Sequence, residues 1–381
     1  MSAPEPFVID VSDNEIADLH ARLRHTRLLP DSPRRPDSGI TASYLRELVD
    51  SWLALDWRSR EADLNAYPQF LAEVDGATIH FVHSPANRAD APTLLVMHGW
   101  PHTFALQLAL VDELPDFNVV VPSFPGFGFS PPYSDGPITE ERLARTMHSL
   151  MTETLGYSSY FTYGEDVSAN VNDLIAGSWP ESIDGIIATH AHFGTDDERA
   201  GYDDPLAQQF FARLTESHGP NGAYGHVQAT RPDTLAAGLN DSPAGLLAWI
   251  TEKLVEWSDV PQGDPRLVEE RISRERILTE AAIYWFTQSI GTSFRPYYEG
   301  ADKPGPMPAV TVPAAIYIQR HEHDYPESVA RGFYRDIHVF ERLDEGGHFT
   351  VAEVPQAMAQ RIRAFADSVR APENQGTIES T

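Results

Sequence analysis

Short, continuous apolar runs separated by helical stretches dominate this sequence from residue 78 onward. Strands that are covered on both faces of a parallel sheet have this uninterrupted apolar character, and helices connect one such strand to the next. The alternation therefore predicts an α/β protein with a mostly parallel central sheet and helices on both of its faces. The expected strands lie at residues 78–83, 93–97, 117–121, 160–163, 186–188, 314–318 and 338–340.

The alternation stops between residues 195 and 304. Apolar residues in this stretch follow a helical period, most clearly at residues 243–257 and 276–289. We expect a helical insertion within the α/β core here. Such an insertion is the natural place for a lid over a site in the core.

The first 75 residues also look helical and carry little strand signal. Asp13 is a candidate cap for a first helix, and Tyr44, Leu48 and Trp52 lie on one face of a second. The expected organisation has five parts. They are an N-terminal segment at residues 1–75, the first part of the core at 76–194, the lid at 195–304, the second part of the core at 305–370, and a polar tail at 371–381.

Composition excludes several classes of function. The chain has no cysteine, which excludes disulfide scaffolds, cysteine-bound zinc, iron–sulfur clusters and thiol catalysis. Its formal net charge of −28 argues against nucleic acid and membranes as partners, because anionic surfaces repel it. No run of about 18 apolar residues occurs, and the first residues lack the features of a secretory signal. We therefore expect a cytoplasmic protein.

The most informative local pattern follows the expected strand at 160–163. A nucleophile elbow is a tight strand-to-helix turn, which needs small residues two positions before and two positions after the nucleophile. Gly164 and Ser168 occupy these positions around Asp166, whereas a centre at Ser168 would place Asp166 and Asn170 there. The pattern predicts a carboxylate nucleophile. The alternative is that Asp166 only caps the following helix.

Two further loops carry chemistry in the same chain order. His98, Gly99, Trp100 and Pro101 follow a buried strand, where a loop can present a backbone N–H to a developing oxyanion. His348 follows two glycines near the C-terminus, which let an imidazole approach a site closely. The chain has fifteen histidines, and any one of them could be structural. The order of the three patterns along the chain is what favours a catalytic role for His348.

A third group should orient the histidine. A carboxylate between the last strands and His348 would fix its tautomer and stabilise the imidazolium, and Glu322 and Asp324 are the candidates. A metal site is the competing interpretation, because histidines and carboxylates cluster in two places. These clusters are His321, His323 and Asp324, and the pair His190 and His192. Neither has a third ligand at diagnostic spacing, so we predict no metal.

At this point the chain resembles the microsomal-type epoxide hydrolases of the α/β-hydrolase superfamily. The resemblance covers residues 5–368, and the order nucleophile, acid, histidine is that of the α/β-hydrolase fold. It rests on motifs in the N-terminal segment, the core and the lid. These motifs are residues 67–70, 74–80, 98–101, 122–130, 224–234, 239–245, 284–285, 295–297 and 347–349.

The resemblance implies roles for individual positions. Asp166 stands at the family's nucleophile, His348 at its water-activating base and Glu322 at its acid, with Asp324 as the alternative. Tyr224 and Tyr297 match the two lid tyrosines that polarise the epoxide oxygen. The backbone N–H groups of Trp100 and Val167 would form the oxyanion hole, and His98, Pro101 and Trp285 would contact the substrate.

The implied reaction converts an epoxide and water to a vicinal diol through an ester on Asp166, with no cofactor. Aromatic residues are plentiful in the lid, which favours a bulky apolar or aryl epoxide. The exposed surface of the lid could pair two subunits as a homodimer. Two features depart from the family pattern, since Glu165 precedes the nucleophile and Ser168 replaces a glycine. Glu165 should point away from the cavity. Because Tyr298 lies beside Tyr297, the sequence leaves open which of the two is the second lid tyrosine.

Three other functions compete with this interpretation. A haloalkane or haloacid dehalogenase uses the same acid–histidine logic and needs N–H donors around the halide, which Trp100 could supply. A serine esterase would need Ser168 or Ser130 as nucleophile, and the elbow pattern speaks against both. A non-catalytic binding protein on the same fold is the third alternative, although every expected catalytic position is filled.

Overall fold

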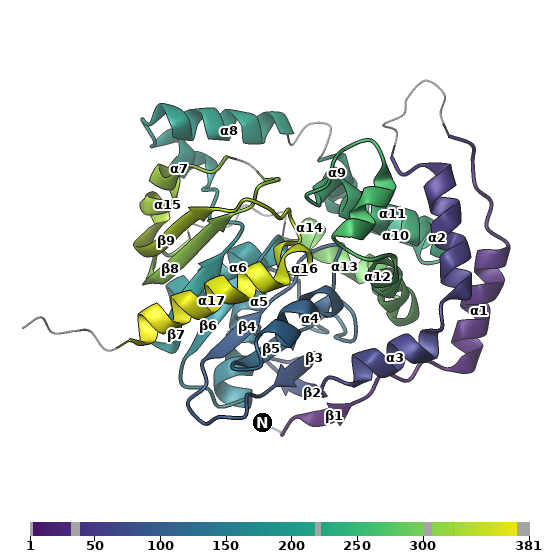
Figure 1. Ribbon diagram of the computed structural model, residues 1–381, viewed down its shortest axis with the longest axis horizontal. Helices are drawn as coiled ribbons and strands as arrows, with labels where there is room; N and C mark the ends of the chain where they lie inside the picture. Colours follow the sequence, from purple (N-terminus) through teal and green to yellow (C-terminus); the bar gives the residue numbers. More distant parts are fainter. Residues whose placement is uncertain (1–2, 32–38, 218–221, 301–306, 323, 372–381) are drawn as a thin grey trace, which may run out of the picture.

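The computed structural model describes residues 3–31, 39–217, 222–300, 307–322 and 324–371, and within them nine strands form one sheet (Figure 1). The strand order is β1-β2-β3-β5-β4-β6-β7-β8-β9. Every strand expected from the apolar runs is present. The bounds are β1 Glu5–Phe7, β2 Gln69–Val74, β3 Ala77–Ser84, β4 Thr93–Val96, β5 Asn118–Pro122, β6 Tyr160–Gly164, β7 Ile183–Ala188, β8 Val310–Ile318 and β9 Tyr334–Arg342.

The sheet is mostly parallel, as predicted. Strands β5, β4, β6, β7, β8 and β9 run parallel to their neighbours, and only the pairs β1–β2, β2–β3 and β3–β5 are antiparallel. Strand β4 lies between β5 and β6. From β4 the chain continues to β5 on one side, and it then crosses back to form β6 on the other side. The loops after β4 and β6 therefore separate at a switch point, where α/β proteins place their binding sites.

Helices cover both faces of the sheet (Figure 1). Helices α4, α16 and α17 pack together on one face, and α5 and α6 pack together on the other. These elements bury strands β4 and β6 completely, which explains their continuous apolar sequences. The bounds are α4 Phe104–Glu113, α5 Glu140–Ser149, η1 Leu150–Thr154, α6 Val167–Ser178, η2 Pro180–Ser182, α15 Glu327–Phe333, α16 Thr350–Glu353 and α17 Pro355–Arg370.

The stretch between β7 and β8 is helical, as the loss of alternation predicts. The helix expected at 243–257 is α11, and the one expected at 276–289 is α12, which begins two residues earlier. The insertion contributes no strand within its described residues. Its elements are α7 Asp196–Ala200, α8 Pro205–Ser217, α9 Ala223–Thr230, α10 Pro232–Leu239, α11 Pro243–Trp257, η3 Pro265–Glu270, α12 Arg274–Thr287, α13 Ile290–Ser293 and α14 Arg295–Glu299.

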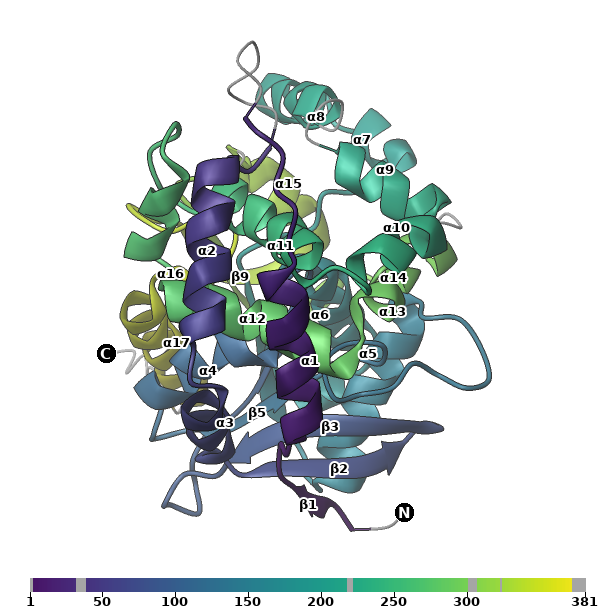
Figure 2. The same cartoon turned by 90° about the vertical axis from the view of Figure 1, so that its right-hand side faces the viewer.

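Three helices of the N-terminal segment, α1 Asp13–Arg24, α2 Ala42–Ala54 and α3 Trp57–Asn65, run along one side of the molecule (Figure 2). Helices α1 and α2 pack against α11, and α2 also packs against α12. The cap of α1 is Ser12 and not Asp13. Ser12 accepts the Glu15 N–H while the Glu15 carboxylate accepts the Ser12 N–H at 2.9 Å, and this reciprocal capping box satisfies two donors at the helix start.

Two strands in the N-terminal segment are not predicted by the sequence analysis. Strand β2 pairs with β3 through a two-residue turn at Asp75 and Gly76, whose φ angles are 48° and 77°. An Asp-Gly pair between two apolar segments is a strong hairpin signal, because both turn residues need positive φ. Strand β1 then pairs with β2 at the edge of the sheet. The N-terminal segment therefore extends the core sheet as well as supporting the insertion.

Within the described residues, no helix combines the length and the apolar character needed to cross a membrane. The polar tail expected at 371–381 lies outside the described part of the chain, apart from Ala371.

The contact between the N-terminal segment and the insertion should contribute strongly to stability. Trp52 of α2 is 1% exposed, and truncation of a buried tryptophan costs about 3–5 kcal/mol. We expect Trp52→Ala to lower the free energy of unfolding by about that amount in urea denaturation. Asp50→Ala, an exposed position on the same helix, is the control and should leave stability nearly unchanged. A Trp52→Ala protein as stable as the control would contradict the importance of this contact.

Candidate active site

Asp166 occupies the turn between β6 and α6. Its backbone has φ 55° and ψ −127°, a conformation that a residue other than glycine adopts only when its surroundings impose it. The flanking residues must be small, since a Cβ added at Gly164 would lie 2.2 Å from the Ser168 carbonyl oxygen. The Ser168 hydroxyl is used inside the turn, where it accepts the Glu165 N–H at 2.9 Å and donates to the Glu165 carbonyl at 2.7 Å. The elbow therefore presents the Asp166 side chain at its apex, whereas the Ser168 hydroxyl is used in hydrogen bonds within the turn.

Three loops bring an acid, a histidine and the elbow aspartate together. His348 follows β9, and its Nδ1 lies 3.0 Å from Glu322 Oε1, just beyond β8. On its other side, His348 Nε2 lies 3.2 Å from Asp166 Oδ2. Asp324 is exposed and forms an ion pair with Arg342, so the structure places Glu322 rather than Asp324 against His348.

The charges of these groups stabilise one another. Burial alone would raise the pKa of Asp166, but hydrogen bonding to His348 and to backbone N–H groups lowers it below its usual value. Burial would likewise lower the pKa of His348, yet hydrogen bonds and charges from Asp166 and Glu322 raise it to about 10. The resting site therefore holds an imidazolium between two carboxylates.

The loop after β4 approaches Asp166 very closely. A Cβ added at Gly99 would lie 2.4 Å from Asp166 Cβ, so only glycine fits there. The Trp100 N–H donates to Asp166 Oδ1 at 2.7 Å, and the Val167 N–H also donates to this carboxylate. Both backbone donors expected to form an oxyanion hole therefore lie against the Asp166 carboxylate.

Two phenols from the insertion face the same carboxylate. Tyr224 of α9 stacks on the Trp100 ring, with ring centres 5.3 Å apart and planes 9° apart, and Tyr297 of α14 meets that ring edge-on at 6.1 Å. The two phenol rings lie edge to face, with ring centres 6.1 Å apart and planes 76° apart. Burial, followed by the charge of Asp166, raises the pKa of both phenols above the usual value. Tyr298 is 57% exposed, so Tyr297 is the tyrosine at the site.

The open space beside Asp166 is divided between two cavities. The first has a volume of about 410 Å³ and contacts Asp166, Tyr224, Trp257 and His348. The second has a volume of about 350 Å³ and contacts Val167 and Tyr297. The first cavity gives a small molecule access to the carboxylate and to Tyr224, and the second gives access to Tyr297.

The structure does not place every expected substrate contact in these cavities. His98 is fully buried, and its Nε2 accepts the Phe124 N–H at 3.1 Å, so it fastens two loops together. Pro101 is buried in the same loop and lines neither cavity. Trp285 lies under the guanidinium of Arg22, whose central carbon is 5.6 Å from the ring centre. These residues act in packing because the loop and α12 turn them away from Asp166.

His190, after β7, joins the group at a position that the sequence analysis considered only as a metal ligand. Its Nδ1 accepts the Asp166 N–H at 3.3 Å, and its Nε2 lies 3.6 Å from Glu322 Oε1. Burial would raise the pKa of Glu322, but hydrogen bonds from His190 and then from His348 hold it well below the usual value. His190 thus links the nucleophile turn to the acid. Its position directly after a strand of the parallel sheet is the sequence feature that could have identified it as a site residue.

The residues of the two metal clusters considered from sequence make other contacts where the structure describes them. His192 Nε2 lies 3.3 Å from Glu198 Oε2, and Asp324 forms an ion pair with Arg342. His323 lies outside the described residues. Donor atoms of His190, Glu322 and His348 do lie within 4.8 Å of one another, so this different set could hold a cation. Their mutual hydrogen bonds account for the cluster without one.

Glu165 points away from both cavities into the protein. Its carboxylate lies 3.0 Å from His102 Nε2, and it accepts hydrogen bonds from Gln107 Nε2 at 2.9 Å and the Tyr163 hydroxyl at 2.5 Å. Burial would raise the pKa of Glu165, but the contact with His102 and then that with Tyr163 lower it. The second carboxylate beside the nucleophile is therefore part of a buried polar network.

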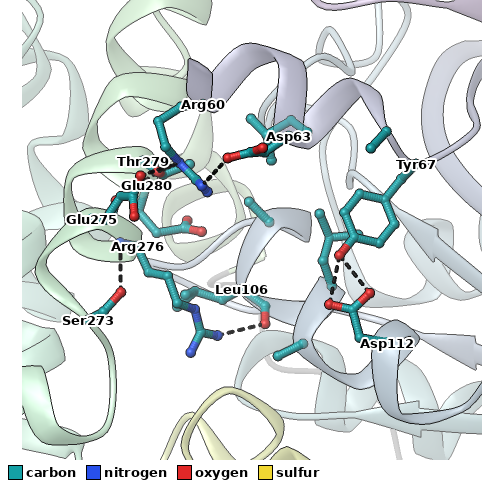
Figure 3. Close-up of a pocket in the computed structure, with 15 residues that line it drawn as sticks. Arg60, Asp63, Tyr67, Leu106, Asp112, Ser273, Glu275, Arg276, Thr279 and Glu280 are labelled. Atoms are coloured by element: carbon teal, nitrogen blue, oxygen red, sulfur yellow. Dashed lines mark hydrogen bonds and ion pairs between the residues drawn. The ribbon is translucent and has the colours of Figure 1, made fainter. Parts of the chain in front are cut away.

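A larger cavity, of about 710 Å³, lies elsewhere, between α3, α4 and α12 (Figure 3). At its rim Arg60 pairs with Asp63 at 2.8 Å. The buried Glu280 of its lining accepts the Thr103 N–H at 2.7 Å, at the end of the loop that carries Trp100. None of the residues expected to be catalytic lines it.

The charge coupling between Asp166 and His348 can be measured. We expect His348 to titrate near pH 10 and Asp166→Asn to lower its pKa by roughly 1 to 3 pH units, because an opposite charge is removed. The folded pKa lies above the unfolded value, so the stability contributed by the protonated ring is full below about pH 6.5 and is lost as pH rises through 10. Imidazole NMR of ¹⁵N-labelled protein, assigned with His348→Gln, measures this pKa. Asp324→Asn is the control, and an equal pKa in both Asn variants would contradict the coupling.

Comparisons with known proteins agree with this geometry. A family model described as epoxide hydrolase N terminus matches residues 4–106, and one described as alpha/beta hydrolase fold matches residues 92–221. Epoxide hydrolase 1 of Oryctolagus cuniculus is 31% identical, over 96% of this chain and 89% of its own. Epoxide hydrolase 1 of Sus scrofa is 30% identical, over 94% of this chain and 88% of its own.

Solved structures show the same relation. The juvenile hormone epoxide hydrolase of Bombyx mori has a TM-score of 0.85 and 26% identity, with 97% of this chain and 95% of that chain covered. The epoxide hydrolase of Aspergillus niger has a TM-score of 0.83 and 28% identity, with 97% of each chain covered. A shared fold over nearly the whole length, together with relatives at 30% identity or more, establishes the relationship. The chain belongs to the epoxide hydrolase family of α/β-hydrolase-fold enzymes.

Proposed function

We propose that this protein adds water to an epoxide to give a vicinal diol, through a covalent ester on Asp166. The observation that carries the proposal is the position of one carboxylate between two kinds of partner. Asp166 lies 3.2 Å from the imidazole of His348 and shares a cavity with the phenol of Tyr224. The Tyr297 ring packs against Trp100, whose N–H binds the same carboxylate. The phenols suit an epoxide oxygen, and the imidazole suits a water molecule.

In the first step, Asp166 attacks one carbon of the epoxide ring. The carbon–oxygen bond of the ring breaks, an ester bond forms, and the released alkoxide takes a proton from a phenol. A phenol that stays protonated at neutral pH can donate without losing its proton beforehand, and the raised pKa values of Tyr224 and Tyr297 keep both in that form. Covalent catalysis divides one difficult addition of water into two easier steps.

In the second step, water hydrolyses the ester. Esterification removes the negative charge of Asp166, one of the causes that raise the pKa of His348. The imidazolium then releases its proton to the phenolate and becomes a base, which Glu322 keeps oriented. His348 takes a proton from water, and the resulting hydroxide attacks the ester carbonyl. The N–H groups of Trp100 and Val167 stabilise the oxyanion, and its collapse breaks the ester carbon–oxygen bond. The departing alkoxide takes the proton of the new carboxylic acid, which releases the diol and restores the Asp166 carboxylate.

The cavity favours an epoxide with an apolar or aryl substituent. Phe193, Leu214 and Trp257 line the larger of the two cavities beside Asp166. Its volume of about 410 Å³ lies within the range of small-molecule sites, which are mostly apolar with a few polar groups that fix orientation. Styrene oxide is therefore a suitable first substrate.

One observation supports a second candidate function. The Trp100 indole N–H is buried beside the site and has no hydrogen-bond partner among the described residues. A dehalogenase needs such a donor to bind the departing halide. The two neighbouring phenols suit an epoxide oxygen better, because a halide leaves without needing a proton. Halide release from a panel of haloalkanes tests this alternative directly.

Substitutions at the nucleophile and the base should separate the two steps. Asp166→Asn should lower turnover of styrene oxide on the order of 10⁴-fold or more, because no carboxylate remains to attack. His348→Gln should accumulate the ester, visible as a protein mass increased by the mass of one epoxide. Asp324→Asn makes the same chemical change at an exposed acid and should retain activity. Full activity of Asp166→Asn would contradict the covalent scheme.

The two phenols should each contribute to ring opening. Tyr224→Phe and Tyr297→Phe should each lower the single-turnover rate of ester formation by about 10²–10³-fold, the range for loss of one donor to a developing oxyanion. Tyr298→Phe is the matched control, since it lies next to Tyr297 but is exposed. If both Phe variants form the ester at the wild-type rate, the epoxide assignment is wrong and halide release becomes the assay of choice.

A further inference from the structure

The loop that carries the Trp100 N–H is fastened at three buried points. His98 accepts the Phe124 N–H at one end, and Thr103 donates its N–H to Glu280 at the other. Between them, His102 contacts Glu165, the residue before the nucleophile. The first two anchors hold the ends of the loop. The third is a side-chain contact that joins the loop to the turn that carries Asp166, in addition to the hydrogen bond from the Trp100 N–H itself.

The His102–Glu165 contact is closed to solvent on every side. Both side chains are 0% exposed, and His102 Nε2 lies 3.0 Å from Glu165 Oε1. His102 Nδ1 has no partner among the described residues, so Nε2 makes the polar contacts of this ring. The same Nε2 accepts the Gly99 N–H at 3.0 Å, so the ring also holds the loop itself. Moving His102 away from Glu165 would therefore weaken polar contacts that no water can replace.

Glu165 cannot follow the loop if the loop moves. Gln107 and the Tyr163 hydroxyl hold its carboxylate from β6 and α4, and the Ser168 hydroxyl holds its backbone N–H. Glu165 is thus a fixed point of the core, and His102 is the movable partner. The contact therefore links this fixed point to the loop whose Trp100 N–H lies 2.7 Å from Asp166 Oδ1.

We propose that His102 and Glu165 form a positioning pair that holds the oxyanion-hole loop against the nucleophile turn, and that ester hydrolysis depends on this pair more than ester formation does. The inference rests on the proposed function. Neither residue touches the substrate space, since neither lines a cavity beside Asp166.

The difference between the two steps follows from the charge on Asp166 Oδ1. During attack on the epoxide, the carboxylate loses negative charge, so its hydrogen bond from Trp100 weakens and exact placement of the donor matters little. During ester hydrolysis, a full negative charge develops on the carbonyl oxygen, and the same donor is most valuable. A misplaced loop should therefore slow only the second step.

The test compares His102→Asn, Glu165→Gln and the double variant with the wild type in rapid-quench reactions with styrene oxide. The rates of ester formation and ester loss are measured separately by intact-protein mass. We expect ester loss to slow by roughly 10–100-fold in all three variants, with ester formation changed less than threefold. The ester should then accumulate in the steady state. The double variant should be no slower than the slower single variant, because the pair acts as one unit.

Thr162→Val is the matched control. Thr162 is 0% exposed and lies on β6, and its hydroxyl donates to Asn172 Oδ1 at 2.7 Å without contacting the loop. Its loss should lower the melting temperature comparably and leave the ester fraction unchanged. The ratio of the two rates does not depend on how much protein folds, so a stability loss cannot imitate the expected result.

Other outcomes would overturn the inference. Equal slowing of both steps, or the same ester fraction in Thr162→Val, would reduce the pair to a structural contact. Independent, additive effects of the two substitutions would show that the residues do not act as a pair. A wild type that forms neither ester nor diol would instead contradict the proposed function, and would remove the basis for any catalytic role of the pair.

Discussion

The strained turn at Asp166 is the constraint on which the rest of the site depends. A positive φ at an aspartate persists here because Gly164, two residues before it, and Ser168, two residues after it, let β6 and α6 approach closely. The turn lies at the switch point of the sheet, so the loops after β4, β7, β8 and β9 can all reach it. Each loop supplies one function, and the helical insertion supplies the phenols.

The electrostatic arrangement links the two proposed steps. At rest, the imidazolium of His348 lies between two carboxylates, which keeps Asp166 ionised for attack. An imidazole that is already protonated cannot take a proton from water, so His348 cannot activate water before the ester has formed. Formation of the ester removes one of the two charges that stabilise the imidazolium. The first step of the proposed reaction thereby creates the base that the second step needs.

Much of the architecture was predictable from local patterns. The apolar runs located the strands of the core sheet, and the small residues around Asp166 indicated a carboxylate elbow. The β1–β2 extension was missed, although Asp75 and Gly76 gave a hairpin signal. Its edge strands are short and only partly buried, so their apolar pattern is weak.

The site was less predictable where contacts join loops that are distant in the chain. His190 meets Glu322 across 132 positions of the sequence, and His102 meets Glu165 across 63, so no local pattern reports either contact. His98 shows the opposite case, since its position in a motif suggested substrate contact while its ring holds two loops together. Periodicity and spacing describe elements and turns, whereas the orientation of a side chain in a loop depends on packing from elsewhere.

The origin of the oxygen in the product tests the central claim, the ester on Asp166, most directly. A single turnover with excess enzyme in H₂¹⁸O should give diol without ¹⁸O, because its new oxygen comes from the Asp166 carboxylate. The label should then appear in the peptide that contains Asp166, as measured by mass spectrometry after digestion. Diol that carries ¹⁸O from the first turnover, with Asp166 unlabelled, would show that water attacks the epoxide directly and would contradict the covalent account.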